Sequence, residues 1–295
     1  MAKRKVDGVL LLDKPEGITS NLALQKARRL FNAEKAGHTG TLDPFATGLL
    51  PLCLGEATKF SQFLLDADKV YLAEAHLGVR TTTADTEGEV LETRPVTQTR
   101  ADVAAVLPRF IGEIEQIPPM HSALKRDGRP LYEYARKGIE LERQARRVVV
   151  HDIELVALDG DRLTLRVHSG KGLYVRTLAE DLGAVLGCGA HLSALRRESV
   201  GPFGIDAAVT LAALEALEPA ARDDRLLPPD CLIEALPRLD LDQESAWQIC
   251  HGQSIWRAGL RVGELMRLYD PASRFIGVAV VDEEGKAAPK RLLAV

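Results

Sequence analysis

Asp43 is the residue whose sequence surroundings most favour chemistry. It lies in the segment GHTGTLDPFATG, residues 37–48, which contains three glycines and one proline. Pro44 disfavours helical geometry at residue 43, and the glycines allow tight turns and the close approach of a ligand backbone. A carboxylate presented by such a loop can act as a nucleophile or stabilise a developing positive charge. The alternative for a lone Asp-Pro pair is a structural Asx-type turn.

The segments before this loop are expected to position it. The apolar run at 8–12 predicts a buried strand, because Asp-Lys-Pro follows it directly. Ser20 is expected to cap a helix that runs to about Phe31, since apolar residues recur along one face of that segment. Residues 37–48 are expected to form a shaped loop and no regular element.

The rest of the chain alternates strands with helices. The predicted strands lie at 70–77, 148–158, 163–168, 265–269, 275–281 and 291–295, and the predicted helices at 99–107 and 174–186. Residues 80–89 and 117–147 are expected to be loops, and 212–245 helix plus linker. Because strand hairpins occur among the helices, the pattern favours an α+β fold with a mixed sheet over a doubly wound parallel one.

Composition excludes several classes of protein. The chain has 295 residues, of which 46% are hydrophobic and 27% charged, and its formal net charge is −4. This length supports one large and one small domain or two medium ones, and the chain is not disordered. Its slightly acidic balance argues against a surface that binds every polyanion. No glycine-rich nucleotide-binding motif is present, so nucleotide-dependent redox chemistry or phosphoryl transfer has no support.

Cysteine usage indicates a reduced, cytosolic protein without a metal site. The four cysteines at 53, 188, 231 and 250 form no C-x-x-C pair, and a closed zinc site needs four ligands. We expect them to be mostly buried thiols. The apolar run near the N-terminus is too short for a signal peptide, and no membrane span is expected there or elsewhere.

The net charge hides two basic segments. Residues 1–36 and 121–147 each hold eight basic and four acidic residues, whereas residues 210–247 hold three basic and nine acidic ones. The second basic segment also contains His121 and Tyr132, and cations mixed with flat rings are typical of RNA-binding segments. An ordinary solvated surface is the alternative.

Seven sequence blocks follow one another along the chain. They are LLLDKPEGITS (10–20), GHTGTLDPFATGLLPLCLGEATK (37–59), KVYLAEAHLG (69–78), TTTADTEG (81–88), IPPMHSALKRDGRPLYEYARKG (117–138), GLYVRTLAEDLG (172–183) and GAHLSALRRE (189–198). In this order they closely resemble the motifs of the bacterial TruB-type tRNA pseudouridine synthases. Residues 275–293 are similar to the short C-terminal domain of that family. One departure is Thr82, where the family often has Asp.

This resemblance implies a fold and a domain organisation. It implies an α+β fold with a mixed, largely antiparallel sheet of the pseudouridine synthase type, flanking helices and loops, and a small β-rich, PUA-like C-terminal domain. The catalytic domain would span residues 1–230 and include an RNA-clamping insertion at about 117–147. Residues 237–295 would form the small RNA-binding domain.

The resemblance also implies an activity: conversion of uridine 55 in the T-arm loop of tRNA to pseudouridine. The reaction breaks the bond from N1 to C1′ and joins C5 to C1′ without redox change, so no cofactor is expected. The target nucleotide must leave its loop to expose C1′. The resemblance further implies an enzyme that needs no membrane, guide RNA or protein partner. We expect it to be cytoplasmic; the sequence leaves its oligomeric state open, with a monomer as the expectation.

Three residues match the catalytic positions of the family. Asp43 would be the nucleophile, and Arg176 would pair with its carboxylate, hold its orientation and depress its pKa. Tyr71 would stack on the target base and take part in proton transfer. Without the resemblance, Arg176 could be an ordinary surface arginine of a helix, and Tyr71 a core residue of a strand.

Four further residues match substrate-binding positions of the family: His38, Tyr174, Leu195 and Lys14. His38 would stack among loop bases, and Leu195 would line the pocket. The alternatives are a histidine bonded within its own glycine-rich turn, a core leucine and, for Lys14, a solvated loop charge.

Competing hypotheses remain open at this level. One is an RNA-binding or RNA-folding protein without turnover, which the joint presence of Asp43, Tyr71 and Arg176 disfavours. Another is a synthase that acts on a different RNA with a guide complex. A carboxylate-based glycosidase is remote, because no second carboxylate accompanies Asp43 within residues 37–48.

Overall fold

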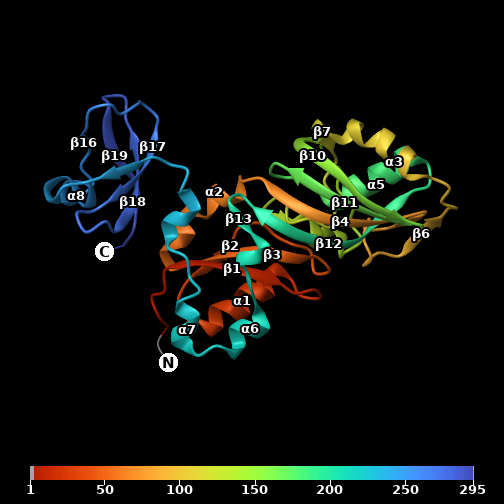
Figure 1. Cartoon of the computed structure of the whole chain (residues 1–295), viewed down its shortest axis with the longest axis horizontal. Helices are drawn as coiled ribbons and strands as arrows, with labels where there is room; N and C mark the ends of the chain where they lie inside the picture. Colours follow the sequence, from red (N-terminus) through yellow and green to blue (C-terminus); the bar gives the residue numbers. More distant parts are fainter. Residues whose placement is uncertain (1–2, 295) are drawn as a thin grey trace.

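The computed structural model describes residues 3–294 as an elongated molecule built on two main sheets (Figure 1). The ten-stranded sheet has the order β14-β1-β3-β12-β4-β11-β10-β7, with β13 paired to β12 and β2 paired to β3. The five-stranded sheet has the order β15-β17-β18-β19-β16 and belongs to the C-terminal part of the chain. Two short hairpins, β5-β6 and β8-β9, lie outside both sheets.

The strands of the ten-stranded sheet are β1 (Gly8–Lys14), β2 (Ala36–His38), β3 (Thr47–Leu54), β4 (Lys69–Leu77), β7 (Gly112–Gln116), β10 (Arg146–Asp159), β11 (Arg162–Ser169), β12 (Ala190–Val200), β13 (Phe203–Gly204) and β14 (Val209–Thr210). Those of the five-stranded sheet are β15 (Arg238–Asp240), β16 (Ile255–Trp256), β17 (Leu265–Tyr269), β18 (Phe275–Val281) and β19 (Lys286–Leu292). The hairpins are β5 (Val79–Thr81) with β6 (Val90–Thr93), and β8 (Lys125–Arg126) with β9 (Arg129–Pro130).

The α-helices are α1 (Ser20–Leu30), α2 (Ser61–Leu65), α3 (Arg100–Val106), α4 (Leu131–Ala135), α5 (Val175–Leu186), α6 (Leu211–Ala216), α7 (Pro219–Asp223) and α8 (Gln243–Cys250). Helices α3 and α5 cover one face of the large sheet, while α1, α6 and α7 lie beside β1 (Figure 1). None of the helices in residues 3–294 is long and apolar enough to cross a membrane.

The predicted fold class is confirmed. Most neighbouring strands of the large sheet are antiparallel, and only the pairs β1-β14 and β12-β3 are parallel. A small β-rich C-terminal domain is also present. The hairpin predicted at 148–168 corresponds to β10 and β11, and the helix predicted at 174–186 to α5, which Gly187 ends at a φ of 82°.

The cap of the first helix was predicted at the wrong residue. Thr19 caps α1, because its hydroxyl accepts the N–H of Leu22 at 3.1 Å. Ser20 is buried and turns instead toward the glycine-rich loop. Its Oγ donates to the carbonyl of Leu42 at 2.9 Å and accepts the N–H of Leu42 at 2.8 Å. The start of α1 therefore supports the residue next to Asp43.

Two strands next to the predicted loop were missed. β2 and β3 take up both ends of residues 37–48, so only 39–46 lie outside strands. The central strand β12 was not predicted, because a register shift between Leu192 and Ala194 breaks the alternation of buried and exposed residues. The last strand was placed at 291–295 but is β19, at 286–292; Val295 lies outside the described residues.

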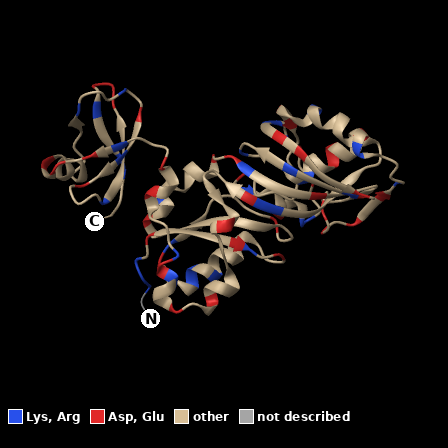
Figure 2. Ribbon diagram, viewed as in Figure 1, with Lys and Arg blue, Asp and Glu red and all other residues tan. Residues whose placement is uncertain are grey.

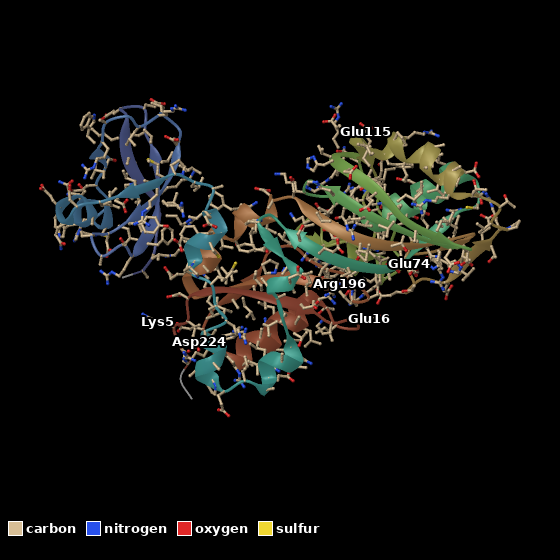
Figure 3. All side chains as sticks on the ribbon, in the orientation of Figure 1. Lys5, Glu16, Glu74, Glu115, Arg196 and Asp224 are labelled. Atoms are coloured by element: carbon tan, nitrogen blue, oxygen red, sulfur yellow. The ribbon has the colours of Figure 1, made fainter. Side chains whose placement is uncertain are left out.

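Basic and acidic residues occur close together along the strands of the large sheet (Figure 2), and several of them pair across strands. Arg162 bonds Glu74 at 2.9 Å, and Arg166 bonds Glu154 at 2.6 Å and Glu198 at 2.9 Å. Glu74, labelled in Figure 3, belongs to β4 and is paired with Ala194 of β12. Because basic and acidic residues are paired here, these strands do not present a continuous basic surface.

The cysteines follow the expected pattern in part. Cys53 and Cys188 are buried, Cys231 is half-buried and Cys250 is exposed, and all four are free thiols. Burial raises the pKa of the Cys53 thiol to about 12, which makes this thiol unreactive.

The small sheet contacts the short helical segment Gly55–Phe60, which follows β3, through an aromatic pair. The rings of Phe60 and Phe275 lie 5.4 Å apart and meet edge to face. Beside them, the ammonium of Lys59 donates to the carbonyl of Leu292 at 2.7 Å. Apolar residues of both parts share this core, including buried Leu64 and Val278.

We predict that Phe60→Ala lowers the free energy of unfolding by about 3–5 kcal/mol, because it opens a cavity in this shared core. Urea unfolding followed by circular dichroism measures the change. Phe63→Ala, three residues away at an exposed position, is the control and should cost only about 0.5 kcal/mol. Equal losses for the two variants would contradict the packing described.

Candidate active site

A pocket of about 390 Å³ lies between the glycine-rich loop, β4, β12 and the start of α5. It brings together five of the seven residues predicted from the sequence: Asp43, Tyr71, Tyr174, Arg176 and Leu195. These residues are far apart in the chain and come from four separate segments. The pocket is therefore assembled by the fold of the large sheet.

Asp43 and Arg176 form a two-point ion pair at the wall of this pocket. Nε of Arg176 lies 3.0 Å from Oδ2 of Asp43, and Nη2 lies 3.3 Å from Oδ1. The arginine side chain is 5% exposed, whereas that of Asp43 is 33% exposed. A two-point contact fixes the plane of the carboxylate, and the exposed fraction leaves it accessible from the pocket. Arg176 is therefore not a surface arginine.

Asp85 is a second carboxylate on Arg176, which the sequence analysis did not assign. Its Oδ2 lies 3.3 Å from Nη1 of Arg176, and its side chain is 2% exposed. Thr83 donates its hydroxyl to Asp85, and the N–H of Glu87 donates at 3.0 Å. The one available signal was the position of Asp85 within the block TTTADTEG. Both oxygens of Asp85 are therefore engaged by donors, and its carboxylate fixes the side of the guanidinium that faces away from Asp43.

The remaining donors of Arg176 bond backbone carbonyls. Nη2 donates to the carbonyl of His121 at 2.7 Å, and Nη1 donates to that of Thr83 at 3.4 Å. The guanidinium thus joins the loop that carries Asp43 to the loops that contain Thr83 and His121. Its position is determined by all three.

The pKa of Asp43 is shifted in the direction opposite to the one expected from its arginine partner. Burial raises the pKa of this carboxyl above its usual value; Arg176 opposes the rise and Asp85 adds to it. Lys14 lowers it to a smaller extent. The predicted depression was wrong as a net effect, because the ion pair does not outweigh the loss of water. Water exclusion leaves the ionised carboxylate less stabilised and more basic.

Two aromatic side chains border the pocket. Tyr71 on β4 is half-buried and also packs against the main core. Tyr174 directly precedes α5, and burial raises the pKa of its hydroxyl. The side-chain amide of Gln116 accepts the N–H of Tyr174 at 3.0 Å and donates to its carbonyl at 3.2 Å. Leu195, 7% exposed, adds an apolar surface.

The other two predicted residues lie outside the pocket lining. Lys14 is fully buried, so the alternative of a solvated loop charge is wrong. Its Nζ donates to the carbonyls of Pro15, Ile18 and Pro44 at 2.8, 2.7 and 3.2 Å, so an expected substrate contact has no support in this geometry. Burial lowers the pKa of Lys14 to about 8. His38 ends β2, and its Nδ1 is buried without a hydrogen bond.

The basic segment 117–147 contributes one wall of the pocket. Ser122, Ala123 and Leu124 line the pocket, and the hairpin β8-β9 and the one-turn helix α4 follow them. The segment is thus less irregular than expected. Most of its basic residues are exposed, and Arg126 and Arg143 line a second cavity of about 410 Å³.

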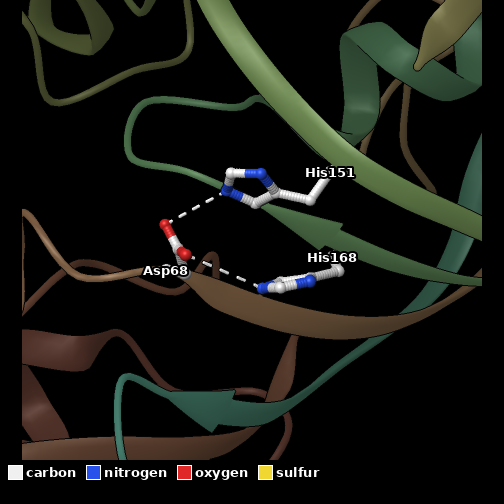
Figure 4. A group of neighbouring side chains, drawn as sticks. All are labelled: Asp68, His151 and His168. Carbon is white, nitrogen blue, oxygen red and sulfur yellow. Dashed lines mark ion pairs between the residues drawn. The ribbon is translucent and has the colours of Figure 1, made fainter. Parts of the chain in front are cut away.

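One group of described residues has the donor types of a metal site. Asp68 lies between His151 and His168 on neighbouring strands (Figure 4), with Nε2 atoms 3.3 and 3.8 Å from its two oxygens. All three side chains are 39–51% exposed and are already paired with one another. They do not line the pocket of Asp43. We interpret the group as a surface ion-pair cluster.

We predict that Asp85→Asn lowers the pKa of Asp43, because it removes a like charge from the opposite side of Arg176. Carboxyl carbon NMR titration of the two proteins measures the shift. Asp181→Asn, outside the pocket lining, is the control and should leave the Asp43 titration unchanged. A higher pKa in Asp85→Asn would contradict the charge arrangement.

Comparison with protein-family models matches nearly the whole chain. Residues 28–175 match the N-terminal domain of the TruB family pseudouridylate synthases. Residues 176–234 match the tRNA pseudouridylate synthase B C-terminal domain, and residues 237–293 match the C-terminal model of pseudouridine synthase II TruB.

Full-length relatives agree with these matches. The chain is 58% identical over 293 residues to tRNA pseudouridine synthase B of Thiobacillus denitrificans, covering 99% of this chain and 98% of that relative. It is 56% identical to the protein of the same name from Aromatoleum aromaticum, covering 99% and 94%. Among solved structures, the Cbf5-Nop10-Gar1 complex contains a chain with a TM-score of 0.73 and 28% identity, covering 98% of this chain and 84% of that one. The chain belongs to the TruB family of pseudouridylate synthases.

Proposed function

We propose that this pseudouridylate synthase isomerises uridine 55 in the T-arm loop of tRNA, with Asp43 as the nucleophile. The observation that carries the proposal is the Asp43–Arg176 pair, which presents an oriented carboxylate to a pocket bordered by Tyr71 and Tyr174. The substrate class is supported by the relatives at 55–58% identity, which are named tRNA pseudouridine synthase B.

The reaction conserves all atoms of the nucleotide. The bond from N1 to C1′ breaks, the uracil turns, C5 bonds C1′, and the proton lost from C5 is balanced by one gained at N1. Asp43 attacks or stabilises the sugar at its anomeric carbon, as carboxylates do in glycoside chemistry. Arg176 keeps the carboxylate oriented throughout, since its other contacts hold it in place. Neither the cleavage of the N1–C1′ bond nor the formation of the C5–C1′ bond requires a cofactor.

The target nucleotide must turn out of the RNA loop to reach Asp43. Tyr71 then stacks on the uracil and moves the proton from C5, while Tyr174 and Leu195 enclose the ribose and base. His38 lies outside the pocket lining and would stack on neighbouring loop bases. Burial lowers the pKa of His38, which favours a neutral ring suited to stacking.

Contacts outside the pocket would come from two parts of the chain. The basic segment 117–147 would clamp the T arm over the pocket, as part of a catalytic domain at 1–230. The domain at 237–295 would bind more distant RNA, and it exposes the large rings of Trp247 and Trp256. RNA binding by the first of these parts gives the basic segment 121–147 a function in a chain that is acidic overall.

We further propose a cytoplasmic, monomeric enzyme that needs no guide RNA or protein partner. The solved structural neighbour comes from a complex with Nop10 and Gar1, but its identity to this chain is 28%. The relatives with twice that identity are named for tRNA. A non-catalytic RNA-binding protein is disfavoured, because binding alone would not require the buried Asp43–Arg176–Asp85 arrangement.

We predict that Asp43→Asn abolishes isomerisation while tRNA affinity stays within about twofold, because the amide keeps the shape of the side chain but is not a nucleophile. Tritium release from tRNA transcripts labelled at C5 of uridine measures turnover, and filter binding measures affinity.

The control for the site is a transcript in which uridine 55 alone is replaced by cytidine. It should release no tritium with the wild-type protein. Full activity of Asp43→Asn would refute the nucleophile, and release from the replaced transcript would refute the position.

We predict that deleting residues 122–146 weakens tRNA binding at least tenfold and leaves the sheet folded, because β7 and β10 pair beside the deletion. Filter binding and circular dichroism are the measurements. Unchanged affinity would refute the clamp. Raising the salt concentration should weaken wild-type binding more steeply than that of the variant, since the deleted segment is basic.

A further inference from the structure

Arg197 on β12 is a buried cation whose role the catalytic scheme does not explain. Its side chain borders the pocket, and the residue is 1% exposed. Among residues 3–294, no carboxylate forms an ion pair with it, whereas Arg176 has two. Burying a charge without a counter-ion is costly, so a specific geometric use must offset that cost.

The guanidinium of Arg197 bonds both ends of the loop that carries Asp43. Nε donates to the carbonyl of Leu49 at 2.7 Å, and Nη2 donates to that of Gly40 at 3.2 Å. Gly40 precedes Asp43 by three residues, and Leu49 follows it by six. A single planar group thus fixes the separation of the two ends.

The backbone of Arg197 reinforces the same connection. Residues 196–197 pair in parallel with Thr47 and Gly48 of β3, and the hydroxyl of Thr47 donates to the carbonyl of Leu195 at 3.4 Å. Gly48 has a φ of 102°, and a Cβ there would overlap the backbone of Arg197. The end of the loop is therefore in direct contact with residue 197.

The middle of the loop is held from the opposite side. Lys14 donates to the carbonyl of Pro44 at 3.2 Å, and Ser20 exchanges two hydrogen bonds with Leu42. These contacts fix the residues beside Asp43. The two strands at the ends of the loop, β2 and β3, pair with each other, and Thr39 donates its N–H and its hydroxyl to the carbonyl of Pro51 at 3.2 and 3.4 Å. Arg197 adds a side-chain bridge between the carbonyls of Gly40 and Leu49 on the pocket side.

We propose that Arg197 is a positioning residue: its guanidinium closes the loop 40–49 through two carbonyls and thereby aligns Asp43 with Arg176. The inference rests on the proposed function, in which Asp43 is the nucleophile. Removing the guanidinium frees the carbonyls of Gly40 and Leu49 from their common donor and lets the Asp43 carboxylate move away from C1′. A displacement of about 1 Å costs about 100-fold in rate.

The test compares Arg197→Met and Arg197→Lys with Arg196→Met. Arg196 is the adjacent residue on β12, with a 40% exposed side chain that pairs with Asp13 (Figure 3). Single-turnover tritium release, with the protein in saturating excess over labelled tRNA, gives the chemical rate. Filter binding gives the affinity, and thermal unfolding shows that each variant is folded at the assay temperature.

We expect the single-turnover rate to fall about 100-fold in Arg197→Met and at least tenfold in Arg197→Lys, with tRNA affinity within twofold. Lysine keeps the charge but lacks the planar fork, so it cannot hold both carbonyls in the same geometry. Arg196→Met should react at the wild-type rate. If Arg197→Met does not fold, Arg197→Lys decides the question.

Three results would overturn the proposal. Wild-type rates in folded Arg197 variants would show that the residue only stabilises the fold. Full rescue by lysine would show that its charge alone matters. A loss of affinity without a loss of single-turnover rate would show a binding role. Asp43→Asn in the same assay separates the two proposals, because its activity would refute the nucleophile itself, whatever Arg197 does.

Discussion

The ion pair between Asp43 and Arg176 is the interaction on which the proposed active site depends. A carboxylate at the wall of a pocket loses water, and burial alone raises its pKa. The guanidinium compensates part of this cost and sets the direction in which the oxygens point. Asp85 and two carbonyls immobilise the guanidinium in turn. An ionised, oriented and accessible carboxylate is the result.

The large sheet supplies the frame for this interaction. β12 carries Leu195 and Arg197 and lies between β3, which continues from the Asp43 loop, and β4, which carries Tyr71. Helix α5 packs on β12 and presents Arg176 from its first turn. The loops around the pocket can be irregular and still be rigid, because each of them is hydrogen-bonded to neighbouring strands or helices of the sheet.

The charges around the pocket differ from those of the whole chain. Lys14, Lys69 and Arg197 are all buried and donate to backbone carbonyls rather than to carboxylates. The formal net charge of −4 therefore coexists with a cationic interior around the site. A pocket of this kind favours an RNA backbone locally, while the paired charges along the strands of the large sheet discourage indiscriminate binding.

Local patterns and motif blocks predicted most of the fold and the main site pair. Asp43 and Arg176 were identifiable because each lies in a long block, and the alternation in β4, β10 and β11 made those strands visible. Asp85 and Arg197 were not assigned, since their roles arise from contacts across more than ninety residues of chain. β12 was missed because its bulge, together with Arg196 and Arg197, interrupts the alternation of apolar and polar residues that predicts a strand. Burial of Lys14 likewise depends on loops that only the fold brings together.

A structure of the protein bound to a T-arm stem-loop would test the central claim most directly. The account predicts that uridine 55 lies in the pocket with its ring against Tyr71 and C1′ within about 3.5 Å of an Asp43 oxygen. The Asp43–Arg176 pair should remain intact in that complex. A uridine still stacked within its loop, or an Asp43 carboxylate turned away from C1′, would contradict it.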